Sequence, residues 1–210
     1  MWRTDERPGL STAAVWYAAR LRYPVTPGTW LNESGRCACG DRACLRPGAH
    51  PLSPCWWLEA SRDAEMVTSW WARRPAAGIV VPTSREFDVL DVPGHAGRAA
   101  LLRLTSNGHR LGPVTETHDG RLSVFVQVGA RLLDDLPYGC QWRYGTYDVH
   151  LHGEGSYVLL PPSPGVRWMH PPRPSSRTLP SAGELVSVLA STCRDSAGQR
   201  RPGLVAAAGS

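Results

Sequence analysis

The alternation of hydrophobic and polar positions along the chain predicts short helices and strands mixed within one fold. Apolar residues at helical spacing predict helices over residues 13–21, 64–74, 97–105 and 182–192. Runs rich in β-branched and aromatic residues predict strands over residues 77–81 and 87–92, and then two strand pairs, 115–117 with 122–128 and 148–151 with 157–160. Since strands paired through short turns run antiparallel, the pattern favours an α+β domain with a largely antiparallel sheet.

Composition divides the chain into a core domain and two flanking segments. Residues 1–10 are predicted to form a flexible arm, 11–192 a domain large enough for one sizeable core, and 193–210 a disordered tail rich in Arg, Gly, Pro and Ala. No run approaches the ~18 apolar residues of a membrane span. The first residues lack the apolar core of a secretory signal. We therefore expect a cytoplasmic protein that does not enter a membrane.

The charge of the chain comes entirely from arginine on the basic side. All 23 basic residues are Arg, and the formal net charge is +5. Because the guanidinium group matches the oxygens of a phosphate, this bias is typical of proteins that bind phosphates or nucleic acid. Codon usage in a GC-rich genome explains the same bias equally well, so the charge alone leaves both readings open.

Four of the six cysteines lie close together in a loop rich in Gly and Pro, at about residues 35–55. Cys37, Cys39, Cys44 and His50 have the spacing of a tetrahedral zinc site, with Cys55 as an alternative to His50. The loop has few apolar residues to stabilise it, and a bound Zn²⁺ would supply the missing free energy of folding. Four protein ligands leave no position for water, which predicts a structural site.

Several segments, taken in order, resemble the bifunctional DNA primase/polymerase family, the primase-polymerases. The loop from Cys37 to Pro51 is similar to the zinc loop of bacterial members, and Trp70-Trp71 with the strand after it is similar to their Trp-Trp helix. Further similar segments are Val89–Val92, Gly112–Gly120 and Tyr147–Ser163, so that the resemblance covers roughly residues 12–192. It implies a two-lobed primase-polymerase-like fold with the zinc loop inserted.

The resemblance also implies a chemistry. Members of the family join nucleotides on a DNA template with two divalent metal ions, Mg²⁺ or Mn²⁺, held by an Asp-x-Asp or Asp-x-Glu pair and a third acid. Asp91 matches the first acid and Asp148 the third. The second acid is replaced by Pro93, and the histidine that contacts the nucleotide phosphates is replaced by Ser123. Asp88 cannot restore the pair, because positions i and i+3 of a strand face opposite sides.

These replacements predict a degenerate member of the family, with Asp91 and Asp148 as remnant metal ligands. Arg121, Ser123 and His150 are the candidate contacts to nucleotide or DNA. Three functions remain open at this point. The chain could bind nucleic acid or nucleotide with weak or absent catalysis, act as a polymerase with a rebuilt site that recruits Glu86 or His118, or serve as a zinc-containing module for a protein partner. The resemblance also implies a replication helicase as a partner in trans.

Overall fold

The computed structural model describes residues 8–109, 111–129, 149–174, 179–183 and 185–188. The N-terminal elements are α1 (Leu10–Trp16), the π-helical turn η1 (Tyr17–Leu21), β1 (Thr26–Pro27), α2 (Trp56–Glu59) and α3 (Ala64–Arg73). They are followed by β2 (Ile79–Pro82), β3 (Asp88–Val92), α4 (Gly94–Ser106), β4 (Val114–Thr117), β5 (Leu122–Val126), β6 (His150–His152), β7 (Tyr157–Leu160) and β8 (Val166–His170). Residues 182–183 and 185–188 are helical.

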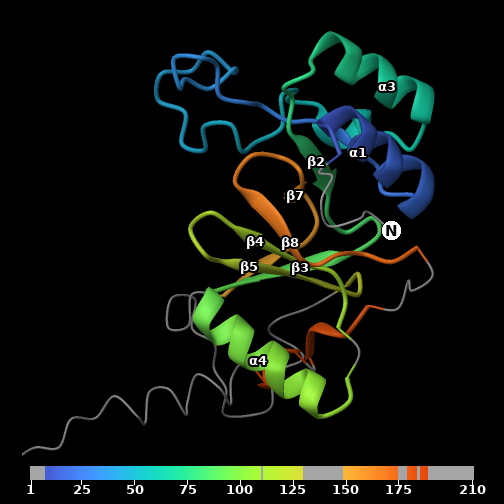
Figure 1. Ribbon diagram of the computed structural model, residues 1–210, viewed down its shortest axis with the longest axis vertical. Helices are drawn as coiled ribbons and strands as arrows, with labels where there is room; N and C mark the ends of the chain where they lie inside the picture. The colour runs from blue at the N-terminus through green and yellow to red at the C-terminus, as the bar shows by residue number, and fades with distance from the viewer. Residues whose placement is uncertain (1–7, 110, 130–148, 175–178, 184, 189–210) are drawn as a thin grey trace, which may run out of the picture.

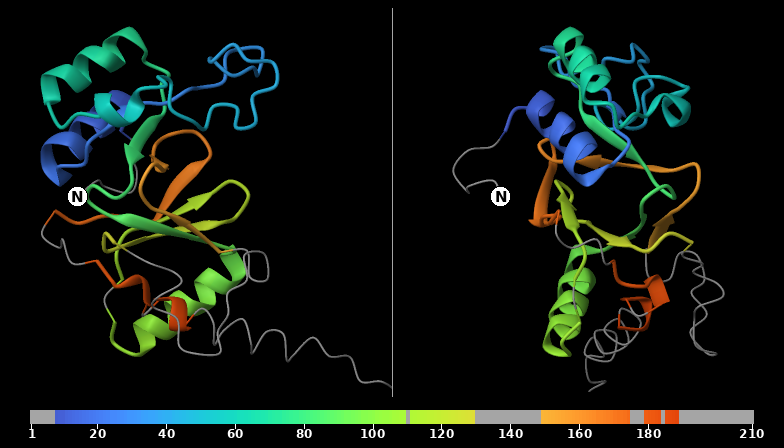
Figure 2. Two further views of the ribbon diagram at one scale, coloured as in Figure 1. Left: turned by 180° about the vertical axis from the view of Figure 1, so that it is seen from behind. Right: turned by 90° about the vertical axis from the view of Figure 1, so that its right-hand side faces the viewer.

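The strands form two sheets, and every strand pair among the described residues is antiparallel. The small sheet has the order β1-β2-β7, and the large sheet has the order β6-β3-β5-β4-β8. Helices α1 and α3 lie with the small sheet at one end of the molecule, whereas α4 lies at the other end, below the large sheet (Figure 1; Figure 2). The predicted α+β fold with a largely antiparallel sheet is confirmed.

The large sheet separates two hydrophobic cores, because alternate residues of a strand face opposite sides. On β3, Val89 packs into the core that holds α1, α3 and the small sheet. Leu90 and Val92 pack into the second core, beneath α4. The two cores give the molecule the two lobes that the family resemblance implies.

Tyr17 of η1 ties the helical lobe to the strands. Its hydroxyl donates to the carbonyl oxygen of Pro161 at 2.5 Å and accepts from the Trp168 indole N–H at 2.8 Å. Burial raises the pKa of Tyr17 well above its ordinary value, so the hydroxyl keeps its proton at any physiological pH. The link joins η1 to both β8 and the segment after β7.

Most predicted elements are present, with shifted ends. Helix α3 begins at Ala64 as predicted, and the Asp63 carboxylate caps it by accepting from the backbone N–H of Glu65 and Met66. Helix α1 begins at Leu10, the last residue of the predicted arm, and α4 begins at Gly94 instead of residue 97. Residues 1–7 of that arm and all of the predicted tail lie outside the described residues.

The predicted pairing of the strands around residues 148–151 and 157–160 is wrong. Strand β6 pairs with β3 in the large sheet, and β7 pairs with β2 in the small sheet. The connection over residues 153–156 therefore passes from one sheet to the other. The physical reason is that each strand has a better partner far away in the sequence.

None of the helices in the described ranges has the length and apolarity needed to cross a lipid bilayer.

Candidate metal centre and nucleotide site

The cysteine-rich loop leaves β1 and returns to it. Thr29 fixes the return: its backbone N–H donates to the His50 carbonyl oxygen at 2.8 Å, and its hydroxyl donates to the same oxygen at 3.1 Å. Isolated bridges join Leu31 to Cys37 on the outgoing side and Gly28 to Pro51 on the returning side. Backbone hydrogen bonds therefore close the base of the loop beside β1, and the bridge within the loop helps to bring Cys37 near His50.

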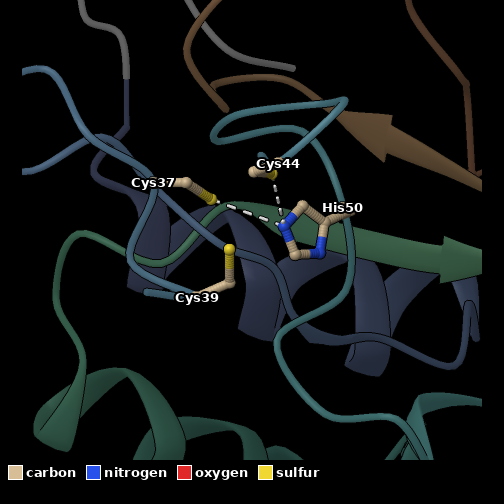
Figure 3. Close-up of side chains that lie close together, drawn as sticks. All are labelled: Cys37, Cys39, Cys44 and His50. Carbon is tan, nitrogen blue, oxygen red and sulfur yellow. Dashed lines mark hydrogen bonds between the residues drawn. The ribbon is translucent and has the colours of Figure 1, made fainter. Parts of the chain in front are cut away.

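Four side chains of this loop converge (Figure 3). The Sγ atoms of Cys37, Cys39 and Cys44 and a ring nitrogen of His50 all lie within 4.8 Å of one another. His50 Nε2 is 3.4 Å from the Sγ of Cys37 and 3.4 Å from that of Cys44. Three sulfurs and one imidazole nitrogen are a donor set that Zn²⁺ prefers in tetrahedral structural sites. The group could bind a metal ion such as zinc.

The second nitrogen of His50 sets which tautomer the ring adopts. Nδ1 lies 2.8 Å from the carbonyl oxygen of Pro51. Because a carbonyl oxygen only accepts, Nδ1 carries the hydrogen and Nε2 presents its lone pair to the three sulfurs. This is the arrangement that a metal-ligating histidine requires.

The thiols of the group are electrostatically linked. Burial acts to raise the pKa of Cys37, but hydrogen bonds, including that from the Gly48 N–H at 3.3 Å, outweigh it and lower the pKa to about 6. Burial, together with the neighbouring Cys37 thiolate, raises the pKa of Cys44 to about 11. A bound cation would relieve the repulsion between the thiolates, as metal binding to cysteine releases protons.

Cys55, the alternative ligand of the sequence analysis, lies apart from this group. It is exposed and precedes α2, where its carbonyl oxygen accepts from the N–H of Leu58 and Glu59. Among the described residues, the metal-binding group therefore consists of the ligand set with His50.

A second candidate site lies on the large sheet. Asp91 lies directly opposite Ser123 of β5 on one side of β3 and opposite His150 of β6 on the other side. Ser123 in turn lies opposite Thr115 of β4. Residues directly opposite in an antiparallel pair share a face, so these four side chains form a polar row across the sheet. The structure thus brings together three of the predicted site residues, Asp91, Ser123 and His150.

Among the described residues, Arg121 is the nearest charged partner of Asp91. Its Nε donates to Asp91 Oδ1 at 2.9 Å, and an NH2 nitrogen lies 3.3 Å from the Asp91 carbonyl oxygen. Both side chains are only 20% exposed, so water screens the pair less than it screens a surface ion pair. Arg121, predicted as a contact to nucleotide or DNA, therefore lies beside Asp91.

His152 is a neighbour of Asp91 that the sequence analysis missed. Its Nε2 lies 3.7 Å from Asp91 Oδ2, and its Nδ1 lies 2.8 Å from the Ser156 hydroxyl. The signal was present in the sequence: His150 and His152 are two residues apart on a strand and therefore share a face. His150, the predicted residue of the two, is the more exposed.

Other acids of the described chain do not join Asp91. Asp88 faces the opposite side of β3, as predicted, where it accepts from the Ser84 hydroxyl at 2.6 Å and the Gly129 N–H at 2.8 Å. Glu116 also faces that side, because its neighbour Thr115 lies in the row with Asp91. Arg98 and Arg167 hold Glu116 at 2.9 Å and 2.5 Å and lower the pKa of its carboxyl.

The remaining predicted positions fall as follows. Pro93 is the residue between β3 and α4, and proline has no carboxylate to offer at the second acid position. His118 and Asp119 lie in the turn between β4 and β5, outside the row. Glu86 forms an ion pair with Arg62. Asp148, the predicted third acid, lies outside the described residues.

The structure is an α+β domain whose N-terminal lobe carries a Cys3His group that could bind a metal ion. A family model described as the N-terminal domain of bifunctional DNA primase/polymerase matches residues 14–182. Since the match covers most of the 210 residues, the chain belongs to this family. No curated protein matches the sequence.

Proposed function

We propose that this primase/polymerase-like domain binds nucleotide or nucleic acid and has weak or no nucleotidyl-transfer activity. The ion pair between Arg121 and Asp91 is the observation that carries the proposal. A carboxylate that ligates a catalytic cation directs its oxygens at the metal. Here Oδ1 of Asp91 accepts from Arg121, and His152 lies beside Oδ2. The guanidinium therefore takes the place beside Asp91 that the cation would need.

The chemistry of two neighbouring positions supports the loss of catalysis. Pro93 stands where the family pattern has the second acid, and Ser123, opposite Asp91, stands where it has the phosphate-contacting histidine. Loss of one group that stabilises charge in the transition state, such as this acid or this histidine, costs about 3–4 kcal/mol, on the order of a thousandfold in rate. We therefore expect any remaining polymerase activity to be far below that of an intact two-metal site.

The binding part of the proposal rests on charge and hydrogen-bonding groups. Arg121, His150 and Ser123 are side chains that donate hydrogen bonds to phosphate oxygens, and they gather on one face of the sheet. The guanidinium of Arg121 has the planar geometry that matches the oxygens of a phosphate as well as those of a carboxylate. No divalent cation is required for such a contact, and Mg²⁺ or Mn²⁺ would matter only if catalysis survives.

We also propose that the metal held by Cys37, Cys39, Cys44 and His50 is Zn²⁺ in a structural role. Four protein donors complete its coordination, which leaves no open position for a reacting water. When bound, the ion cross-links a loop that contributes little to the hydrophobic cores. The fold of the N-terminal lobe then becomes coupled to metal content.

Primer extension tests the catalytic part of the proposal. With a primed DNA template, all four deoxynucleotides and Mg²⁺ or Mn²⁺, we expect no extension above background. Extension that is abolished by Asp91→Ala would overturn the proposal and establish an active polymerase with a rebuilt site.

Nucleotide affinity tests the binding part. With the zinc-loaded chain and no added Mg²⁺ or Mn²⁺, we expect the domain to bind a deoxynucleoside triphosphate and Arg121→Ala to weaken that binding about tenfold, the value of one charged hydrogen bond. The matched control is Arg73→Ala, which removes an exposed arginine from α3. If neither nucleotide nor single-stranded DNA binds at low salt, the binding proposal is wrong and the module for a protein partner becomes the better reading.

A further inference from the structure

Three aromatic rings and two arginines form a continuous strip on the surface of the N-terminal lobe. We call Trp57, Trp56, Tyr157, Arg46 and Arg85 the aromatic strip. The ring centroids of Trp56 and Trp57 are 5.7 Å apart, and those of Trp56 and Tyr157 are 5.4 Å apart. The Arg85 guanidinium carbon lies 4.8 Å from the Trp57 ring centroid, and that of Arg46 lies 5.6 Å from the Tyr157 centroid. A guanidinium thus flanks each end of the strip.

The two tryptophans of the strip do not contribute to the cores. Trp71 is buried in the first hydrophobic core, and the partly buried tryptophans packed against that core are Trp16, Trp30, Trp70 and Trp168. Trp56 and Trp57 belong to neither described core and are half-buried on the short helix α2. The next residue, Leu58, is 80% exposed. Core packing therefore does not explain why two large aromatic side chains occur here.

The arginines give the strip a positive charge at defined places. Arg46 extends from the cysteine-rich loop, is exposed, and donates to the Tyr157 hydroxyl at 3.4 Å. Arg85 comes from the turn between β2 and β3 and donates to the Trp57 carbonyl oxygen at 2.6 Å. Cation–π contact and hydrogen bonding hold both guanidiniums beside the rings. The result is a set of three aromatic rings with one phosphate-binding guanidinium at each end.

The strip also lies close to the nucleotide site along the chain. Tyr157 begins β7, and its neighbour Ser156 lies within hydrogen-bond distance of His152, which approaches Asp91. The connection from β6 to β7 therefore joins His152, beside Asp91, to Tyr157 of the strip.

We propose that the aromatic strip binds single-stranded nucleic acid, with bases stacked on Trp57, Trp56 and Tyr157 and phosphates held by Arg46 and Arg85. Every base has a flat face, so stacking accepts any sequence, and basic groups beside the rings follow the backbone. A duplex hides its bases and cannot stack in this way. The proposal deepens the proposed function, because it assigns the binding of a strand to a surface separate from Arg121 and Asp91.

A fluorescently labelled oligothymidylate, titrated with the zinc-loaded chain at several salt concentrations, tests the strip. We expect Trp57→Ala to weaken binding about tenfold, the effect of losing one stacked base, and Trp57→Phe to recover most of the affinity. Arg46→Ala should weaken binding and reduce the salt dependence by about one counterion. Arg73→Ala removes the same charge from α3, away from the strip, and should change little. Zinc content and circular dichroism verify that each variant is folded.

These measurements can contradict strand binding by the strip without contradicting the proposed function of the domain. If the Trp57 and Arg46 variants bind the oligonucleotide as tightly as the wild-type chain does, the proposal that the strip binds a strand is wrong. The proposed function of the domain would still stand. Equal affinity for a duplex of the same length would also overturn the strip. If no oligonucleotide binds while a deoxynucleoside triphosphate does, the strip is wrong and only nucleotide binding remains.

Discussion

Replacing Cys39 with serine is expected to reduce the zinc content of the purified chain from about one ion to nearly none. A hydroxyl is a poor zinc ligand, and the Sγ of Cys39 is one of only four donor atoms in the group. Since the free energy of binding a structural zinc ion is on the order of 10 kcal/mol and is coupled to folding, the loop should lose its fixed structure with the ion. Elemental analysis measures the first effect.

Trypsin measures the second effect, because Arg36 and Arg42 are exposed within the loop. We expect cleavage after these residues to be slow in the zinc-loaded chain and fast after Cys39→Ser or treatment with a chelator. Cys55→Ser is the matched control, because Cys55 is exposed and lies outside the metal-binding group. Unchanged zinc content in Cys39→Ser, or loss of zinc in Cys55→Ser, would contradict the ligand assignment.

The features that local sequence dictates were the ones that could be predicted. Asp63 caps α3 through atoms only two and three residues away, so its role can be read from the sequence. The four metal ligands lie within a short loop, and their spacing alone limits how they can meet. The family resemblance marks Asp91 and Ser123 as site positions, but their direct pairing comes from the register of β3 with β5, which the structure supplies.

The features that depend on distant partners could not be predicted. The glycine-rich connection over residues 153–156 has the sequence of a hairpin turn, yet the strands on either side pair with β3 and β2. That choice is made by the two hydrophobic cores, which need β6 and β7 on different sheets. His152 lies near Asp91 because β6 pairs with β3, and this contact was missed because that pairing was not predicted. The ion pair of Arg121 with Asp91 likewise requires the register of β3 with β5.

A close approach between backbones holds that ion pair in place. Gly94 begins α4 directly after Pro93, and a Cβ atom added to it would lie 2.0 Å from the carbonyl oxygen of Gly120. Gly120 precedes Arg121, so this contact sets the position of Arg121 relative to the end of β3. Only glycine permits the approach, because any other residue brings a Cβ into the Gly120 backbone.

We therefore expect Gly94→Ala to destabilise the domain, although alanine is the better helix former by about 1 kcal/mol. The added methyl group meets backbone, which cannot rotate away as a side chain can, and overpacking of this kind costs about 3 kcal/mol or more. The net loss of about 2 kcal/mol should lower the melting temperature by roughly 4–8 °C in a domain of this size. Thermal denaturation followed by circular dichroism measures it.

The same substitution should also act on the nucleotide site, since relief of the clash displaces the turn that carries Arg121. We expect Gly94→Ala to weaken deoxynucleotide binding in the folded chain at low temperature, by an amount similar to Arg121→Ala. Gly153→Ala is the control, because the nearest atom to its added Cβ is the Ser84 hydroxyl at an ordinary 3.7 Å. A Gly94→Ala chain that is as stable as the wild type would show that α4 and the β4–β5 turn are not held by this contact. Loss of stability without loss of nucleotide affinity would instead separate the packing of α4 from the placement of Arg121.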